Sequence, residues 1–123
     1  MEAALFFPNA IFFVFDLANK KVQVPEYING VLTAANESCV SIGTQAEVDG
    51  EVTVKLSDKF SESEKDSCEV VFNGFIVTPG KKIAIVTSEL DKVLEMDVRD
   101  RKTHVKIWVD DLNYPSVVLV EAA

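Results

Sequence analysis

Strict alternation of apolar and polar residues is the feature that most constrains how this chain can fold. In residues 51–57, EVTVKLS, one face would carry Val52, Val54 and Leu56, and the other Thr53 and Lys55. Residues 92–98, KVLEMDV, and 103–109, THVKIWV, repeat the pattern. A period of two is typical of a β-strand with one buried face. The chain is therefore expected to be built from strands that share a core on one side.

Turn sequences separate these strands from further apolar runs. Such runs occupy residues 3–7, 10–16, 38–44, 68–77, 81–88 and 116–121. Asp49-Gly50 and Thr78-Pro79-Gly80 are turn sequences, and Gly74 predicts a bulge or bend inside the fourth of these runs. About eight or nine short strands at these spacings predict a mainly β protein. We expect an antiparallel two-sheet β-sandwich that forms one domain over residues 1–123.

One segment favours a helix instead. Residues 25–38, PEYINGVLTAANES, begin with a proline, which suits a first helical turn, and continue with apolar residues at helical spacing. Gly30 lies in the middle of the segment and lowers its helix propensity. The sequence predicts one short helix near residues 26–36.

The apolar run LFFPNAIFFVF, residues 5–15, resembles neither a signal peptide nor a membrane helix. The only charge before it is the negative Glu2, Pro8-Asn9 divides it, and Asp16 ends it. A membrane-spanning helix needs about 20 apolar residues, and a signal peptide needs a positive start. We expect two strands joined by a turn, the second covered on both faces. A cytoplasmic protein is expected, in which Cys39 and Cys68 are buried free thiols, although spacing alone also allows a disulfide.

The charge balance restricts the partners that the protein can bind directly. The chain contains 20 Asp and Glu against 12 Lys and Arg, and its net charge is −8. Nucleic acid and anionic membranes are bound by basic surfaces, so neither is an expected partner. A basic protein, a cation or a neutral ligand fits the charge, although acidity also serves solubility alone.

The sequence offers no constellation that indicates catalysis or a cofactor. His104 is the only histidine, and its neighbours RKTHVKIW place it on the wet face of a strand. No nucleophile motif or phosphate-binding glycine loop is present, and no Cys/His cluster indicates zinc. Asp110 and Asp111 could offer oxygen ligands to Ca²⁺, but they fall short of the usual ligand number. We therefore expect no catalytic residue, no metal site and no cofactor.

Two groups of residues are candidates for binding a partner. Alternation points Trp108 outward, with Tyr114 in the following loop, where the two could anchor a protein or stack on a sugar ring. A covered Trp108, under a loop or a lysine stem, is the alternative. Residues 58–67, DKFSESEKDS, are expected to form a solvated acidic loop in which the one aromatic residue, Phe60, is exposed. The full candidate set is Asp58, Phe60, Glu62, Glu64, Asp66, Trp108, Asp110, Asp111 and Tyr114.

The order of these segments resembles a known family. FFVFD at residues 12–16 is followed by GVLTAANESCVSIGT and by the hairpin sequence DGEVTVKLSD. FNGFIVTPGKKIAIVTSE and THVKIWVDDLNYPSVVLVEA complete the pattern. This order is similar to that of the competence protein J family, small acidic inhibitors of a DNA-entry nuclease. The resemblance implies a β-sandwich and an inhibitory role, and it transfers no individual site residue.

Two hypotheses of function follow. The first is a non-enzymatic acidic binding protein that acts as an inhibitor or immunity-type partner of a basic enzyme such as a nuclease. The second is a small-molecule or carbohydrate-binding module with Trp108 and Tyr114 as its stacking platform. The protein can be a monomer or a homodimer, because edge strands of an open sandwich can pair between chains.

Overall fold

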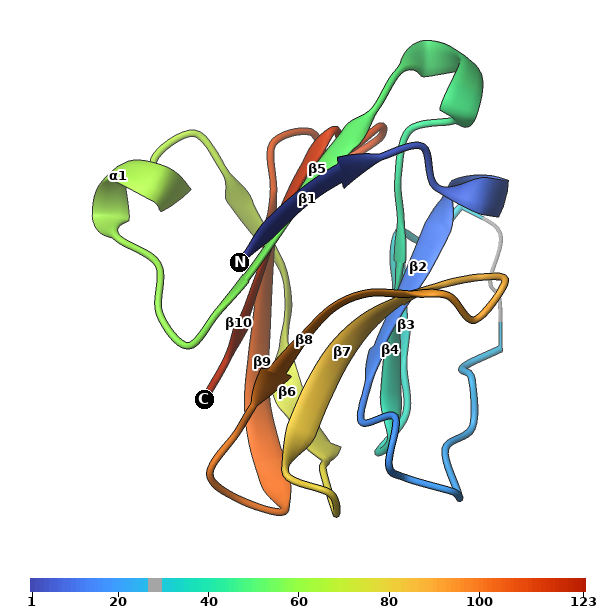
Figure 1. Ribbon diagram of the computed structural model, residues 1–123. Helices are drawn as coiled ribbons and strands as arrows, with labels where there is room; N and C mark the ends of the chain where they lie inside the picture. Colours follow the sequence, from blue (N-terminus) through green and yellow to red (C-terminus); the bar gives the residue numbers. More distant parts are fainter. Residues whose placement is uncertain (27–29) are drawn as a thin grey trace.

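The strands pair into two five-stranded sheets that face each other in the computed structural model, which describes residues 1–26 and 30–123 (Figure 1). In spatial order, sheet A contains β1 (Glu2–Leu5), β5 (Val52–Ser57), β10 (Val117–Ala122), β9 (Lys102–Val109) and β6 (Glu69–Val77). Sheet B contains β3 (Thr33–Ala35), β4 (Cys39–Gly43), β2 (Ile11–Phe15), β7 (Lys82–Thr87) and β8 (Lys92–Asp97). The predicted two-sheet sandwich is confirmed, with ten strands rather than eight or nine.

The alternation determines which side chains fill the space between the sheets. On β5, Val52, Val54 and Leu56 are fully buried in the main core, while Lys55 points outward. Ile107 on β9 and Ile85 on β7 join the same core from the two sheets. Each fully buried side chain of this kind contributes about 1.5–3 kcal/mol, so one-sided strands are held in register by their apolar faces.

Strand β2 is covered on both faces, as its continuous apolar sequence predicted. Phe12 and Val14 point into the main core. Phe13 and Phe15 point to the outer side of sheet B and pack with Cys39, below Leu17 and Val22. The segment that follows β2 therefore forms a lid over the outer face of sheet B.

The helix predicted over residues 26–36 is wrong, because none of its described residues, 26 and 30–36, is helical. Thr33–Ala35 forms the short strand β3, which pairs with β4 through partners such as Ala34 and Ser41. Residues 27–29 of the predicted helix lie outside the described residues. Cross-strand pairing prevails here because β4 offers an open edge, whereas Gly30 at φ +83° interrupts helical geometry.

A helix forms instead in the segment that was expected to be a solvated loop. The helix α1 (Glu62–Lys65) is a single turn with Ser61 as its N-cap. Two 3₁₀ turns, η1 (Pro8–Ala10) and η2 (Glu47–Asp49), occupy loops between strands. In Figure 1, α1 lies on the outer side of sheet A, away from sheet B.

Two details of sheet A depart from expectation. The bulge predicted at Gly74 lies earlier on β6, between Val70 and Phe72. At Gly74, a Cβ would come within 2.9 Å of the tip of the Phe72 ring, so a larger residue there would require that ring to shift. Furthermore, β10 runs parallel to β5, whereas every other described strand pair is antiparallel.

The connections between strands gather at two ends of the sandwich. Residues 6–10, 44–51, 88–91 and 110–116 lie at the end where β2, β5 and β10 begin, together with residues 30–32. We call this the acidic end, because these segments contain seven Asp and Glu residues and neither Lys nor Arg. Residues 36–38, 78–81 and 98–101 lie at the opposite end.

Candidate protein-binding surface

The segment 58–68 crosses the outer face of sheet A and packs against it through an aromatic anchor. Phe60 is only 3% exposed and contacts Trp108 and Leu119, with Cys68 and Val117 at the margin of the cluster. The expectation that Phe60 is exposed was therefore wrong. Although the segment is acidic and rich in serine, its single aromatic residue holds it to the sheet.

Trp108 points outward from β9, as alternation predicted, but this segment covers it. The indole is 5% exposed and meets the Phe60 ring edge-on, with 6.3 Å between the ring centroids. The amino groups of Lys65 and Lys106 each lie 5.1 Å from the ring centroid, within cation–π range. Of the two alternatives for Trp108, the covered one is therefore correct. Its ring is not available to stack on a sugar.

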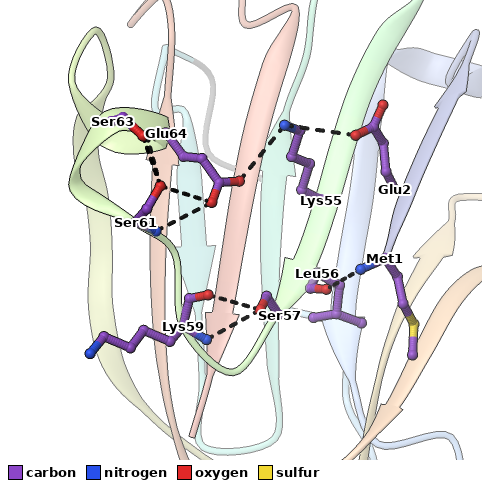
Figure 2. Close-up of polar contacts among 9 residues, drawn as sticks. All are labelled: Met1, Glu2, Lys55, Leu56, Ser57, Lys59, Ser61, Ser63 and Glu64. Atoms are coloured by element: carbon purple, nitrogen blue, oxygen red, sulfur yellow. Dashed lines mark hydrogen bonds and ion pairs between the residues drawn. The ribbon is translucent and has the colours of Figure 1, made fainter.

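The carboxylate of Glu64 in α1 forms hydrogen bonds within its own segment (Figure 2). Glu64 and Ser61 form a reciprocal capping box, in which each side chain accepts a hydrogen bond from the other's backbone N–H at 3.3 Å. The hydrogen bonds from the Ser61 backbone and hydroxyl, followed by the nearby charge of Lys55, lower the pKa of Glu64. The Glu64 carboxylate therefore caps the N-terminus of α1, and its hydrogen-bonding capacity is partly used within the protein.

Lysines neutralise part of the same acidic segment. Figure 2 shows the amino group of Lys55 between two carboxylates, 3.8 Å from Glu64 and 3.7 Å from Glu2. Lys65 pairs with Glu62 at 3.3 Å. Asp58 and Asp66 are exposed, and Asp58 accepts only a long 3.5 Å hydrogen bond from Ser57. The net field of this segment is therefore weaker than its sequence indicates.

Asp110 and Asp111 shape the loop that joins β9 to β10. Asp110 accepts hydrogen bonds from the Ser116 backbone at 2.9 Å, the Ser116 hydroxyl at 2.6 Å and the Val117 backbone at 3.0 Å. Asp111 accepts from the backbone of Asn113 at 2.8 Å and of Tyr114 at 3.0 Å. These carboxylates hold the loop in a conformation that leaves Tyr114 69% exposed.

The electrostatics of the loop follow from these contacts. Partial burial acts to raise the pKa of Asp110, but the hydrogen bonds from Ser116 and Val117 outweigh it and hold the pKa below its usual value. The backbone N–H groups of Tyr114 and Asn113 lower the pKa of Asp111. Both residues carry negative charge at neutral pH, at the acidic end of the sandwich.

Tyr114 lies at a different place from Trp108. It lines a hollow of about 510 Å³ at the acidic end, between the loop 110–116, η1 and the start of β3. The structure therefore separates the two aromatic residues that were expected to form one platform. Sequence reasoning missed this hollow, although the apolar residue Leu112 beside two aspartates offered a signal for it.

His104 and the two cysteines pack against side chains of the two sheets. His104 hydrogen-bonds the Asn73 side chain and stacks at 5.0 Å on Phe75. Both cysteines are free; Cys39 lies under the outer face of sheet B, and Cys68 borders the Trp108 cluster on sheet A. Burial raises the pKa of Cys39 to about 12, and burial followed by the Asp110 charge raises the pKa of Cys68.

Within residues 1–26 and 30–123, no three His, Cys, Asp or Glu side chains gather closely enough to hold a metal ion. None of the helices in this part of the chain has the length and apolar character that a membrane crossing requires.

Fold and surface together define an open, two-sheet β-sandwich with an acidic surface. A protein of known structure has a similar fold. The structure is similar to the crystal structure of ComJ from Bacillus subtilis, described as an inhibitor of the DNA-degrading activity of NucA. The TM-score is 0.67, and the match covers 99% of this chain and 93% of ComJ at 12% sequence identity. No family model and no curated protein matches the sequence. The resemblance in fold that the strand order predicted is confirmed.

Proposed function

We propose that this protein is an inhibitor-type partner of a basic enzyme and acts by binding rather than by catalysis. The observation that carries the proposal is the end-to-end match of its fold to ComJ, a nuclease inhibitor. The net charge of −8 supports it, because an acidic protein can compete with nucleic acid for the basic surface of a nuclease. A nuclease is therefore the first candidate partner, and a cytoplasmic location belongs to the same proposal.

The proposal leaves two acidic surfaces on which the partner could bind. One is the α1 segment, with Asp58, Glu62, Glu64 and Asp66. The other is the loop that contains Asp110, Asp111 and Tyr114. Charge reversal on the surface that the partner contacts should weaken the complex and reduce its salt dependence. The alternative, a small-molecule or carbohydrate-binding module, relied on Trp108 and Tyr114 as one stacking platform. Trp108 is buried and only Tyr114 lines the hollow, which counts against that platform.

The experiment is a nuclease-inhibition titration. A fixed amount of purified NucA degrades plasmid DNA in the presence of rising concentrations of the protein, and a secreted or membrane-bound nuclease of the source organism, chosen for its basic charge, is tested in parallel. We expect inhibition that is complete near equal molar amounts and that weakens with added salt. The matched control is the heat-denatured protein, which retains the net charge but has no folded surface. Full DNA degradation at large excess, with no complex by size-exclusion chromatography, would contradict the proposal.

A further inference from the structure

Charge is distributed unevenly between the two ends of the sandwich. The seven carboxylates of the acidic end are all exposed, and none of them forms an ion pair with another described residue. They are Glu47, Asp49, Glu51, Glu89, Asp91, Asp110 and Asp111. Connections toward the opposite end contain five basic residues, which are Lys20, Lys21, Lys81, Arg99 and Arg101, against three acidic ones, which are Asp16, Glu37 and Asp100. The molecule therefore carries a dipole along its strands.

Apolar side chains project from the same acidic loops. Val48 is 94% exposed between Glu47 and Asp49, and Leu90 is 68% exposed between Glu89 and Asp91. Leu112, beside Asp111, repeats the arrangement on a third loop. Phe6 and Tyr114 are also exposed at this end. Apolar side chains surrounded by charge are the composition of a protein-binding surface, in which a polar rim encloses apolar contacts.

Hydrogen bonds around η1 hold these loops in fixed relative positions. The Asn9 side chain donates to the Ser88 hydroxyl at 2.9 Å, and that hydroxyl donates to the carbonyl oxygen of Pro8 at 3.1 Å. The backbone N–H of Thr44 donates to Ala10, and that of Gln45 donates to Pro115, both at 2.9 Å. Loops that are ordered before binding lose less entropy when a partner docks.

The hollow beside Tyr114 gives the acidic end a concave part. Its wall includes Ile11, Leu32 and Leu112, and its volume of about 510 Å³ is large enough to accept a side chain from another protein. The α1 segment differs in its charges and in its aromatic residue. Its glutamates are paired with lysines, and its aromatic residue is buried beneath it.

We propose that the acidic end is the docking surface for a protein with a basic face, and that the hollow receives an apolar side chain of that partner. This inference rests on the proposed function and assigns its surface: the loops 44–51, 88–91 and 110–116 rather than α1. Charge complementarity identifies the occupant, because unpaired carboxylates attract a basic protein and repel nucleic acid or an acidic membrane. The dipole would also orient the partner toward this end during approach.

The test maps binding with a probe that does not depend on the identity of the partner. A synthetic peptide that alternates arginine and leucine is titrated into the isotope-labelled protein, and backbone amide shifts are recorded. We expect shifts concentrated in residues 44–51, 88–91 and 110–116. A peptide with serine in place of leucine should bind about tenfold more weakly, because it cannot fill the hollow. Shifts concentrated in residues 58–68, or no measurable binding, would overturn the inference.

Matched triple variants supply the second readout. Glu47→Gln/Glu89→Gln/Asp91→Asn removes three charges from the acidic end, and Asp58→Asn/Glu62→Gln/Asp66→Asn removes three from the α1 segment. We expect the first triple to weaken peptide binding about tenfold and the second to change it less than about twofold. Equal losses in the two triples would refute the assignment. Likewise, Val48→Ser/Leu112→Ser should weaken binding, whereas Val70→Ser/Phe75→Ser, exposed on sheet A, should not.

The nuclease titration separates the two proposals. If a nuclease is inhibited, the acidic-end triple should lose inhibition and the α1 triple should retain it. Inhibition that is lost only in the α1 triple would overturn the surface assignment and leave the proposed function standing. If neither nuclease is inhibited, the proposed function fails, while the peptide map still decides where a basic protein binds.

Discussion

The ring of Phe60 packs edge-on against Trp108 and fixes the acidic segment 58–68 to the outer face of sheet A, with 6.3 Å between the ring centroids. This contact joins a loop to a strand 48 positions further along the chain. It explains why an acidic, serine-rich sequence is ordered over the face of the sheet. The ordered segment in turn shields the only tryptophan from solvent.

Phe60→Ala should release this segment. Loss of the buried ring is expected to reduce the free energy of unfolding by about 3 kcal/mol, the lower end of the range for buried aromatic residues. Trp108 emission should shift to the red, and iodide should quench it. Phe6→Ala is the control, because Phe6 is exposed and its loss should change neither measurement. Unchanged emission in Phe60→Ala would contradict the packing.

Leu90→Asn should stabilise the fold. Leu90 has φ +67°, and the left-handed conformation costs a residue with a Cβ about 1–2 kcal/mol, less for asparagine. Because Leu90 is largely exposed, little apolar burial is lost, and we expect chemical denaturation to show a gain of about 0.5–1 kcal/mol. Leu112→Asn, an exposed leucine outside the left-handed region, should be neutral. A loss of stability in Leu90→Asn would refute this account.

Asp110→Ala should destabilise the β9–β10 loop in a pH-dependent manner. The three hydrogen bonds that Asp110 accepts are expected to contribute about 1 kcal/mol together at this exposed site. The folded pKa lies below the unfolded value of about 3.9, so this stability is present above that pH and is lost as pH falls through the folded pKa. Denaturation at pH 7 and below pH 4 should show the wild-type advantage shrinking. Asp58→Ala is the control, and an advantage that grows in acid would contradict the assignment.

The two thiols should react in a fixed order. Burial raises the pKa of Cys39 to about 12, so almost no thiolate is present at pH 8, whereas Cys68 is partly exposed. Iodoacetamide at pH 8 should label Cys68 first, and Cys39 should be labelled only after denaturant is added. Mass spectrometry of the intact Cys68→Ser variant isolates the second event. Rapid labelling of native Cys39 would show that the lid over sheet B opens.

Local patterns predicted the strands well and missed what depends on tertiary contact. The alternation in residues 51–57 and 103–109 survives folding because one face of each strand is buried in the core. Thr33–Ala35 was missed because a three-residue strand has too few alternations to outweigh neighbouring helical spacing. The α1 turn had a local signal, the Ser61-x-x-Glu64 capping box. The high charge and serine content of the segment predicted a solvated loop instead.

The candidate surface was predictable only in part for the same reason. Asp110, Asp111 and Tyr114 lie where a loop was expected, and the sequence places them at the end of a strand. The grouping of Val48, Leu90 and Leu112 depends on three hairpin and crossover connections that meet at one end of the sandwich. No local pattern contains that information, because the three segments are far apart in the sequence.

The parallel pairing of β5 with β10 has a consequence for how the protein is made. Val117–Ala122 enters sheet A between β5 and β9, yet it is synthesised after both of them. While the ribosome is still translating this segment, the two flanking strands have unpaired edges, and sheet A cannot close. Such long-range pairing is slow to form. A nascent chain that stalls before Val117 would therefore expose the edges of both β5 and β9, and the loop 110–116 would lack the strand that fixes its second end.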